Sequence, residues 1–164
     1  MLDAFHQRCS PASLLRRWGR THLPHPVLGR LLSHTESWLG LGGDGKPIAL
    51  VSAGPLSREA GVFDLGLQVA DTWHRRGIGT LLARHAAEHA HTLGAHTLSA
   101  YTEASNEPML RLLDRLGLVH HIRHGSHLDV RLPLGAGPPR ISSLLTLQGT
   151  HAPQRPGGEG SDPA

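Results

Sequence analysis

The sequence is short of several residue types, and each shortage narrows what the protein can be. It has a single cysteine, Cys9, so no disulfide can form within the chain, which fits a reducing compartment. No stretch approaches the roughly 18 consecutive apolar residues of a membrane span. The opening residues, M-L-D-A-F-H-Q-R, have no apolar run behind a basic one. The sequence therefore predicts neither a membrane segment nor a signal peptide, and the expected location is cytoplasmic.

Aromatic residues and lysine are also scarce. Aromatic residues make up 4% of the chain, and Lys46 is the only lysine, although the formal net charge is +3. Many Arg, Ala, Gly and Pro residues with few Lys and Asn are typical of a GC-rich genome, so the basic character is poor evidence for nucleic-acid binding. No basic cluster is interleaved with aromatic residues. Nucleic acid is therefore not an expected partner.

The 164 residues suit one domain that can bury a core without disulfides or metal. Gly, Pro and Ser accumulate from Gly135 onward, and apart from residues 141–147 almost nothing there could pack into a core. We therefore predict a domain over residues 1–134 and a mostly disordered tail over residues 135–164.

Hydrophobic periodicity and turn residues predict alternating groups of helices and strands. Ser10 and Pro11 mark the start of the first helix, and Gly94 is a candidate C-cap. The expected helices cover residues from Pro11 to Trp18, 27–32, 78–93 and about 107–116. The expected strands cover residues 37–41, 48–53, 62–69, 97–101, 119–122 and 128–132. The first three strands form an antiparallel meander in this prediction.

The most informative stretch is residues 69–82, V-A-D-T-W-H-R-R-G-I-G-T-L-L, which joins a strand to a helix through a basic turn. Gly77 and Gly79 let the backbone approach a ligand closely, and the first N–H groups of the helix lack intrahelical partners. Arg75 and Arg76 add positive charge. These features indicate a phosphate site at the helix N-terminus, although close helix packing also explains a G-x-G turn.

This turn resembles the coenzyme A pyrophosphate loop of the GNAT superfamily of N-acetyltransferases. That loop reads Gln or Arg, two variable residues, Gly, one variable residue, then Gly or Ala, and His74 stands at its first position here. The segment N-E-P-M-L-R-L-L-D-R-L-G-L, which begins at Asn106, resembles the second cofactor motif of the family. The segment F-H-Q-R-C-S-P-A-S-L-L-R-R-W resembles the opening helices of GNAT domains in bacterial protein lysine acetyltransferases.

The resemblance implies a single α/β domain with a mixed, mostly antiparallel sheet flanked by helices. The edge strand that precedes the first helices in the family has no counterpart, because Met1 falls almost at the helix. We expect either a start assigned too late or a sheet without its first strand. The resemblance also implies an acyltransferase that moves acetyl from acetyl-CoA to a primary amine by direct attack. The resemblance to lysine acetyltransferase domains favours a protein lysine as the amine, but an amino acid or a small amine also fits the superfamily, so the acceptor is left open. A homodimer is left open too.

The resemblance further implies that the strand before the loop pairs with the pantetheine arm. A backbone N–H near Leu67 then faces the thioester oxygen, and Asn106 contacts pantetheine. From the sequence alone, Asn106 can also cap the helix that has Pro108 in its first turn. The expected cofactor-binding residues are Leu67, Gln68, Val69, Arg75, Arg76, Gly77, Ile78, Gly79, Thr80 and Asn106.

Acetylation of an amine needs a base, because a lysine amine titrates near ~10.4 and is mostly protonated at neutral pH. Asp64 is the first candidate, since it falls where the protein lysine acetyltransferases carry a glutamate, although a solvated strand residue is the alternative. Tyr101 and Glu103 share a strand face and are the other candidates. Leu113 stands where many GNAT enzymes have a tyrosine general acid. These departures keep open a catalytically inactive, acyl-CoA-binding or regulatory domain.

Histidine is unusually common, with 14 residues. His85 and His89 are one helical turn apart, a spacing that can chelate a metal. Four more crowd the predicted last hairpin, namely His120, His121, His124 and His127. No cysteine or carboxylate set completes a recognisable site, so no metal is expected, and a histidine-rich metal-binding protein is a third hypothesis.

Overall fold

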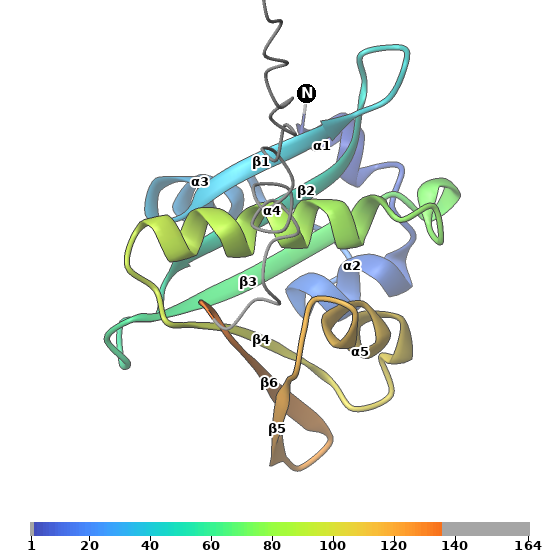
Figure 1. Cartoon of the computed structure of the whole chain (residues 1–164). Coiled ribbons are helices and arrows are strands. Elements are labelled where there is room, and N and C mark those ends of the chain that lie inside the picture. Colours follow the sequence, from blue (N-terminus) through green and yellow to red (C-terminus); the bar gives the residue numbers. More distant parts are fainter. Residues whose placement is uncertain (1, 136–164) are drawn as a thin grey trace, which may run out of the picture.

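The structure is a computed structural model that describes residues 2–135, apart from the side chain of Leu31. Its helices are α1 (Leu2–His6), α2 (Pro11–Trp18), α3 (His25–His34), α4 (Ile78–Thr92) and α5 (Glu107–Asp114). Its strands are β1 (Glu36–Leu41), β2 (Pro47–Pro55), β3 (Val62–Val69), β4 (Thr97–Glu103), β5 (His120–His124) and β6 (His127–Pro133). A 3-10 turn, η1 (Asp71–Trp73), follows β3 (Figure 1).

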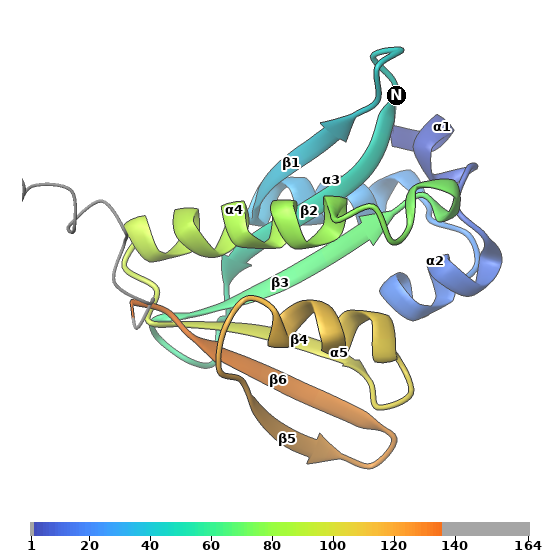
Figure 2. The same ribbon diagram turned by 45° about the vertical axis from the view of Figure 1, so that its right-hand side comes forward.

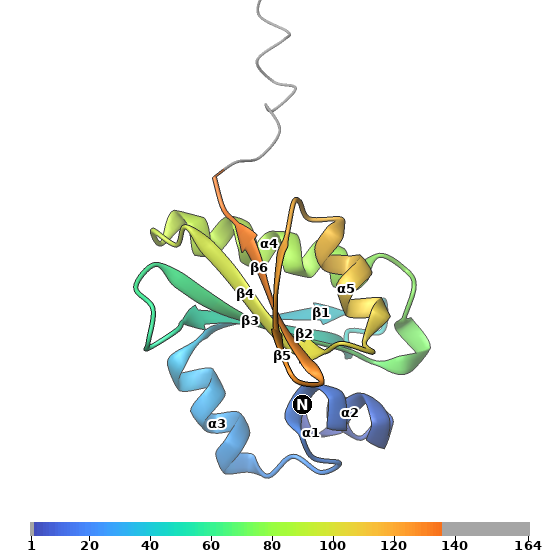
Figure 3. The ribbon, with the colours of Figure 1, turned by 90° about the horizontal axis from the view of Figure 1, so that it is seen from below.

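The strands form one six-stranded mixed sheet in the order β1-β2-β3-β4-β6-β5. β3 and β4 are parallel, and every other neighbouring pair is antiparallel. α4 and α5 lie on one face of the sheet, and α1, α2 and α3 lie on the other (Figure 3). The structure therefore confirms the predicted α/β fold with a mostly antiparallel sheet.

Two apolar clusters hold these layers together. The larger cluster joins the sheet to α4 and α5 through side chains such as Val51, Leu98 and Leu113. The smaller cluster joins the other face to the N-terminal helices through side chains such as Phe5 and Leu50. Burial of such side chains stabilises a fold by about 1.5–3 kcal/mol each, so both helical layers are firmly attached.

The parallel strands β3 and β4 stay together only at their beginnings. Their pairs run from Val62 with Thr97 to Asp64 with Ser99, although each strand continues for several more residues. Beyond Asp64 the two strands diverge, and the sheet opens into a V (Figure 2). This opening places the candidate site.

The predicted elements are present, and their ends differ by a few residues. Ser10 caps α2 through a hydrogen bond from the Ser13 N–H, as expected from the sequence. The predicted domain boundary near residue 134 stays a prediction, and the predicted tail from residue 136 lies outside the described residues. No helix within residues 2–135 is long and apolar enough to span a membrane.

Candidate active site

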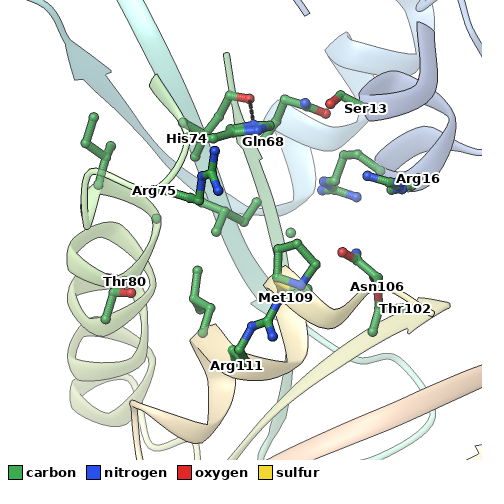
Figure 4. A pocket seen from close by; sticks show the side chains of 18 of the residues that line it. Ser13, Arg16, Gln68, His74, Arg75, Thr80, Thr102, Asn106, Met109 and Arg111 are labelled. Atoms are coloured by element: carbon green, nitrogen blue, oxygen red, sulfur yellow. Dashed lines mark hydrogen bonds between the residues drawn. The ribbon is translucent and has the colours of Figure 1, made fainter. Parts of the chain in front are cut away.

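A cleft of about 820 Å³ occupies the opening between β3 and β4. Its walls come from α2, the loop after β3, the first turn of α4, and α5 (Figure 4). Of the expected cofactor residues, all except Arg76 line this cleft. Residues far apart in the sequence are therefore brought to one site.

The edge of β3 that faces the cleft carries backbone groups without a strand partner. Ala70 N–H donates to the Ile48 carbonyl over 2.9 Å, and Leu56 N–H donates to the Val62 carbonyl over 2.8 Å. These bonds show that the even-numbered residues of β3 direct their backbone N–H and C=O groups toward β2. Because backbone groups alternate along a strand, the odd-numbered residues direct their N–H and C=O groups to the cleft. These residues are Leu65, Leu67 and Val69.

The loop before α4 lies in the cleft wall and has the backbone features expected of an anion site. Gly77 is the N-cap of α4 and has a φ of 79°, in the left-handed region that glycine adopts without strain. Gly77 has no side chain that could cap the helix, so within the described residues its first N–H groups lack a capping partner. A β-carbon on Gly79 would lie 2.9 Å from Leu112 Cδ1 and 3.3 Å from Leu67 Cδ2, so this glycine lets α4 pack closely against β3 and α5. Close packing therefore explains Gly79, and the approach of a ligand to this turn stays a prediction.

The side chains of the loop have separate roles. Nε2 of His74 donates a hydrogen bond to the Val69 carbonyl oxygen over 2.9 Å and joins the loop to the end of β3. Arg75, with a φ of 59°, lines the cleft. The guanidinium of Arg76 lies 4.7 Å from the centre of the Trp73 ring, and Arg76 is not part of the cleft wall. The two adjacent arginines thus point to different surroundings.

The cleft is rich in positive charge. Its walls include Arg16, Arg17, Arg75, Arg111 and Arg115. Figure 4 shows Arg16 of α2, Arg75 of the loop and Arg111 of α5 around the cleft. An anionic ligand is therefore favoured.

The one carboxylate in the cleft wall is already satisfied within the described residues. Asp71 accepts hydrogen bonds from Ser10 N–H over 2.7 Å, from Ser10 Oγ over 2.8 Å and from Ser13 Oγ over 2.8 Å. Burial acts to raise the pKa of Asp71, but the bonds from Ser10 and Ser13 outweigh it and lower that pKa. These bonds hold the start of α2 against η1 and so position the cleft-facing side of α2.

Two amide side chains line the cleft between these charges. The Nδ2 group of Asn106 donates to Thr102 Oγ1 over 2.9 Å, and its side chain makes no capping bond to α5. Gln68 is only 5% exposed, and its Oε1 has no hydrogen-bond partner in the described part of the protein. The Gln68 side chain also interacts with that of buried Cys9. Both amides therefore belong to the cleft wall, and Gln68 is also held by the N-terminal helical layer.

The three candidate bases occupy different surroundings. Asp64 belongs to the last β3–β4 pair and does not line the cleft itself. Its side chain is exposed to solvent, but partial burial by the surrounding protein raises the pKa of this carboxyl group. The positive charge of Arg17 lowers the same pKa, and the negative charge of Asp129 raises it.

The other two candidates lie on β4. Tyr101 lines the cleft, is 59% exposed and stacks on His127 with ring centres 5.1 Å apart. Glu103 lies outside the cleft wall and accepts a bond from Ser105 Oγ over 3.4 Å.

The candidate metal-binding histidines are engaged in packing. His85 and His89 pack edge-on against Trp38, with ring centres 5.1 Å and 5.0 Å away. Within residues 2–135, no three His, Cys, Asp or Glu side chains gather in a group that could hold a metal ion.

Sequence reasoning missed the contribution of α2 and the basic side of α5. Ser13, Arg16 and Arg17 line the cleft from α2, and Arg111 and Arg115 line it from and just beyond α5. The S-L-L-R-R-W segment did carry a signal. Its two adjacent arginines lie next to the apolar face of the predicted helix. Because charged side chains are rarely buried in a core, they must face either solvent or a binding site.

The open strand edge and the basic walls make this cleft suitable for a long anionic ligand. Residues 3–118 match the sequence model of the Acetyltransferase (GNAT) family, and the chain belongs to that family. The match confirms the family expected from the sequence and the expected enzyme class, an acetyl-CoA-dependent N-acetyltransferase. Acetyl-CoA as the cosubstrate follows from it.

Solved structures agree on the fold. The GNAT domain of S. lividans PAT is 20% identical, with 81% of this chain and 83% of that chain covered and a TM-score of 0.72. The ribosomal-protein-S18-alanine N-acetyltransferase from Escherichia coli is 15% identical, with 85% and 89% covered and a TM-score of 0.64. Spermidine N-acetyltransferase from Vibrio cholerae, solved with CoA and spermine, is 14% identical, with 79% and 86% covered and a TM-score of 0.61. No curated protein matches the sequence.

Proposed function

We propose that this protein transfers acetyl from acetyl-CoA to a primary amine by direct attack, with both substrates bound at once. The observation that carries this proposal is the cleft between β3 and β4. It joins an open strand edge to a glycine-capped helix N-terminus and to the arginines Arg75 and Arg111 of the loop and of α5. Such a site fits a ligand with a polar amide arm at one end and phosphates at the other.

Different parts of the cleft suit different parts of the cosubstrate. The N–H groups at Gly77, Ile78, Gly79 and Thr80, with Arg75, are suited to the diphosphate. The backbone of Leu67 and Val69 and the amides of Gln68 and Asn106 are suited to the pantetheine arm. Arg76 would add charge from a greater distance, because it packs on Trp73.

Acetyl-CoA supplies a thioester whose C–S bond breaks as the amine nitrogen bonds to the acetyl carbon, and the sulfur leaves as the CoA thiolate, which takes a proton from water. In our proposal the Leu67 N–H donates to the carbonyl oxygen, a contact that can contribute roughly 3 kcal/mol to acyl transfer. Asp64 takes the proton that the amine releases, through a water where the amine lies beyond its reach. Its raised pKa brings it closer to that of a useful base at neutral pH. Tyr101 and Glu103 are the alternatives.

Release of free thiol from acetyl-CoA, measured with a panel of amines, tests this proposal. We expect Asp64→Asn to lower turnover about 100- to 10,000-fold and to leave acetyl-CoA affinity unchanged. Tyr101→Phe and Glu103→Gln serve as matched comparisons on the neighbouring strand. Loss of turnover in one of them, with a fully active Asp64→Asn variant, would move the base to that residue.

A second candidate is a catalytically inactive domain that binds an acyl-CoA. Leu113, where many family members carry a tyrosine acid, is 1% exposed and part of the core. No proton donor can act from that position. Affinity for acetyl-CoA without thiol release for any amine would favour this candidate. The cytoplasmic location, the lack of a nucleic-acid partner and the state of assembly stay predictions.

A further inference from the structure

We propose that the amine acceptor carries a carboxylate close to its amine, and that Arg17 binds this carboxylate. The inference rests on the proposed function above and names the class of acceptor. Arg17 lines the cleft from α2, on the sheet face that also carries Asp64.

The guanidinium of Arg17 lies directly on the backbone of β3. A β-carbon on Gly66 would overlap its Nη2 and Cζ atoms, so the glycine makes room for this group. Its Nη2 also donates to Ser52 Oγ over 3.3 Å, and Ser52 is the β2 partner of Gly66. The Trp18 ring lies 4.3 Å from Cζ on another side. The position of the charge is thus set by β2, β3 and α2 together.

Arg17 takes part in no ion pair within residues 2–135. Among the described residues, no carboxylate lies within ion-pair distance of Arg17, and its one hydrogen bond goes to a neutral hydroxyl. Burial acts to lower the pKa of Arg17, and Asp64 opposes this only through its electrostatic field. A guanidinium has five N–H donors, and a partly buried one without a counter-ion is unfavourable. A bound anion would use the remaining donors.

The spacing on β3 suits an acceptor with both charges. Asp64 and Gly66 are two positions apart and on the same face, about 7 Å along the strand. An amine near Asp64 would therefore bring an adjacent carboxylate within reach of the guanidinium over Gly66. The side chain of a lysine within a protein, or a polyamine, offers no carboxylate near its amine, so Arg17 would stay without a counter-ion. The site therefore favours a free amino acid or a similar zwitterion.

The test compares acceptors that differ only in the carboxylate. Thiol release from acetyl-CoA is measured with each standard amino acid, with its carboxamide, and with a lysine peptide blocked at both ends. We expect kcat/KM for the preferred amino acid to exceed that for its carboxamide about 10- to 100-fold. Arg17→Gln should reduce this ratio to near one, mainly through KM for the amino acid, and Arg17→Lys should restore part of it.

Two further variants test whether Arg17 acts by binding the carboxylate of the acceptor. Gly66→Ala keeps the charge but displaces the guanidinium, and it should reduce the same ratio. Arg20→Gln removes an equal charge from an exposed residue just after α2 that does not line the cleft, and it should change nothing. Acetyl-CoA affinity is measured for every variant and should stay constant. A fall in that affinity with Arg17→Gln would assign Arg17 to the cosubstrate and overturn the inference.

The remaining outcomes distinguish the inference from the proposed function. Turnover that is equal for amino acids and carboxamides, or better with the blocked peptide, overturns the inference and leaves the proposed function intact. If no amine is acetylated, the proposed function fails, and titration of amino acids into the CoA-loaded protein decides the inference. If amino acids bind and Arg17→Gln abolishes this binding, the carboxylate site at Arg17 is supported. If amino acids do not bind, the inference is overturned together with the proposed function.

Discussion

Nε2 of His74 lies 2.9 Å from the carbonyl oxygen of Val69, so a loop side chain is hydrogen-bonded to the end of β3 that faces the cleft. His74 stands at the position where the resemblance to the coenzyme A loop leads one to expect Gln or Arg. All three side chains can donate to a carbonyl. The bond therefore explains how a histidine can take this position in the loop.

Replacing His74 tests whether this bond organises the loop. We expect His74→Ala to weaken acetyl-CoA binding about fivefold, the equivalent of a lost hydrogen bond of about 1 kcal/mol. His74→Gln should retain nearly full affinity, because its amide can donate to the same carbonyl. Calorimetric titration measures both. Equal losses in the two variants would show that the imidazole itself contacts the cosubstrate.

The surroundings of Asp64 predict the pH dependence of turnover. Asp64 acts as a base only when ionised, and desolvation raises its pKa, so the acidic limb of kcat/KM should lie above the usual range of an aspartate. Arg17 lowers this pKa, so Arg17→Gln should move the limb to higher pH. If the acidic limb of the kcat/KM profile lies at the same pH in Arg17→Gln as in the unsubstituted protein, the result argues against Asp64 as the base.

The same pKa shift predicts how Asp64 affects stability. A carboxyl group whose pKa is higher in the folded state weakens folding once the pH exceeds its unfolded value. We therefore expect Asp64→Asn to be at least as stable as the unsubstituted protein at neutral pH, as measured by urea unfolding. A clear loss of stability would mean that the carboxylate makes a stabilising contact in the folded protein.

We expect the side chain of Asp71 to stabilise the folded protein. Asp71→Ala leaves the Ser10 N–H and the hydroxyls of Ser10 and Ser13 without their acceptor, which should cost about 2 kcal/mol in the free energy of unfolding. Because the folded pKa is lowered, this contribution is present above the unfolded pKa of about 3.9 and disappears as the pH falls through the folded pKa. Asp114→Ala, an exposed site at the end of α5, should change stability by about 0.5 kcal/mol or less. Urea unfolding at neutral and acidic pH provides the comparison.

The helices and strands could be predicted from the sequence because their apolar periods are local. The ends were less predictable, as α5 shows. Its apolar pattern continues to Leu116, but the helix ends at Asp114 and the Leu116 N–H bonds to the Leu113 carbonyl in a turn. Periodicity records which side chains are buried and does not record where helical hydrogen bonds stop.

The candidate site was predictable only where glycines mark it. Gly77 and Gly79 pointed to the loop, but the adjacent Arg75 and Arg76 looked equivalent in the sequence. Arg75 has a left-handed φ, so the chain changes direction there. Arg75 therefore lines the cleft, whereas Arg76 packs on Trp73. The role of α2 was also hidden, because its orientation depends on bonds to Asp71, about sixty residues away. Such contacts exist only in the folded chain.

Titration of the protein with acetyl-CoA, beside variants at these two arginines, tests the central claim most directly. We expect Arg75→Gln to weaken binding about 10-fold, as for a lost charge-assisted hydrogen bond. Arg76→Gln removes the same charge one residue further on and should weaken binding much less. Binding by the unsubstituted protein that follows this order would support acetyl-CoA in the cleft between β3 and β4. A folded protein that does not bind acetyl-CoA, or one in which Arg75→Gln binds as well as the unsubstituted protein, would contradict it.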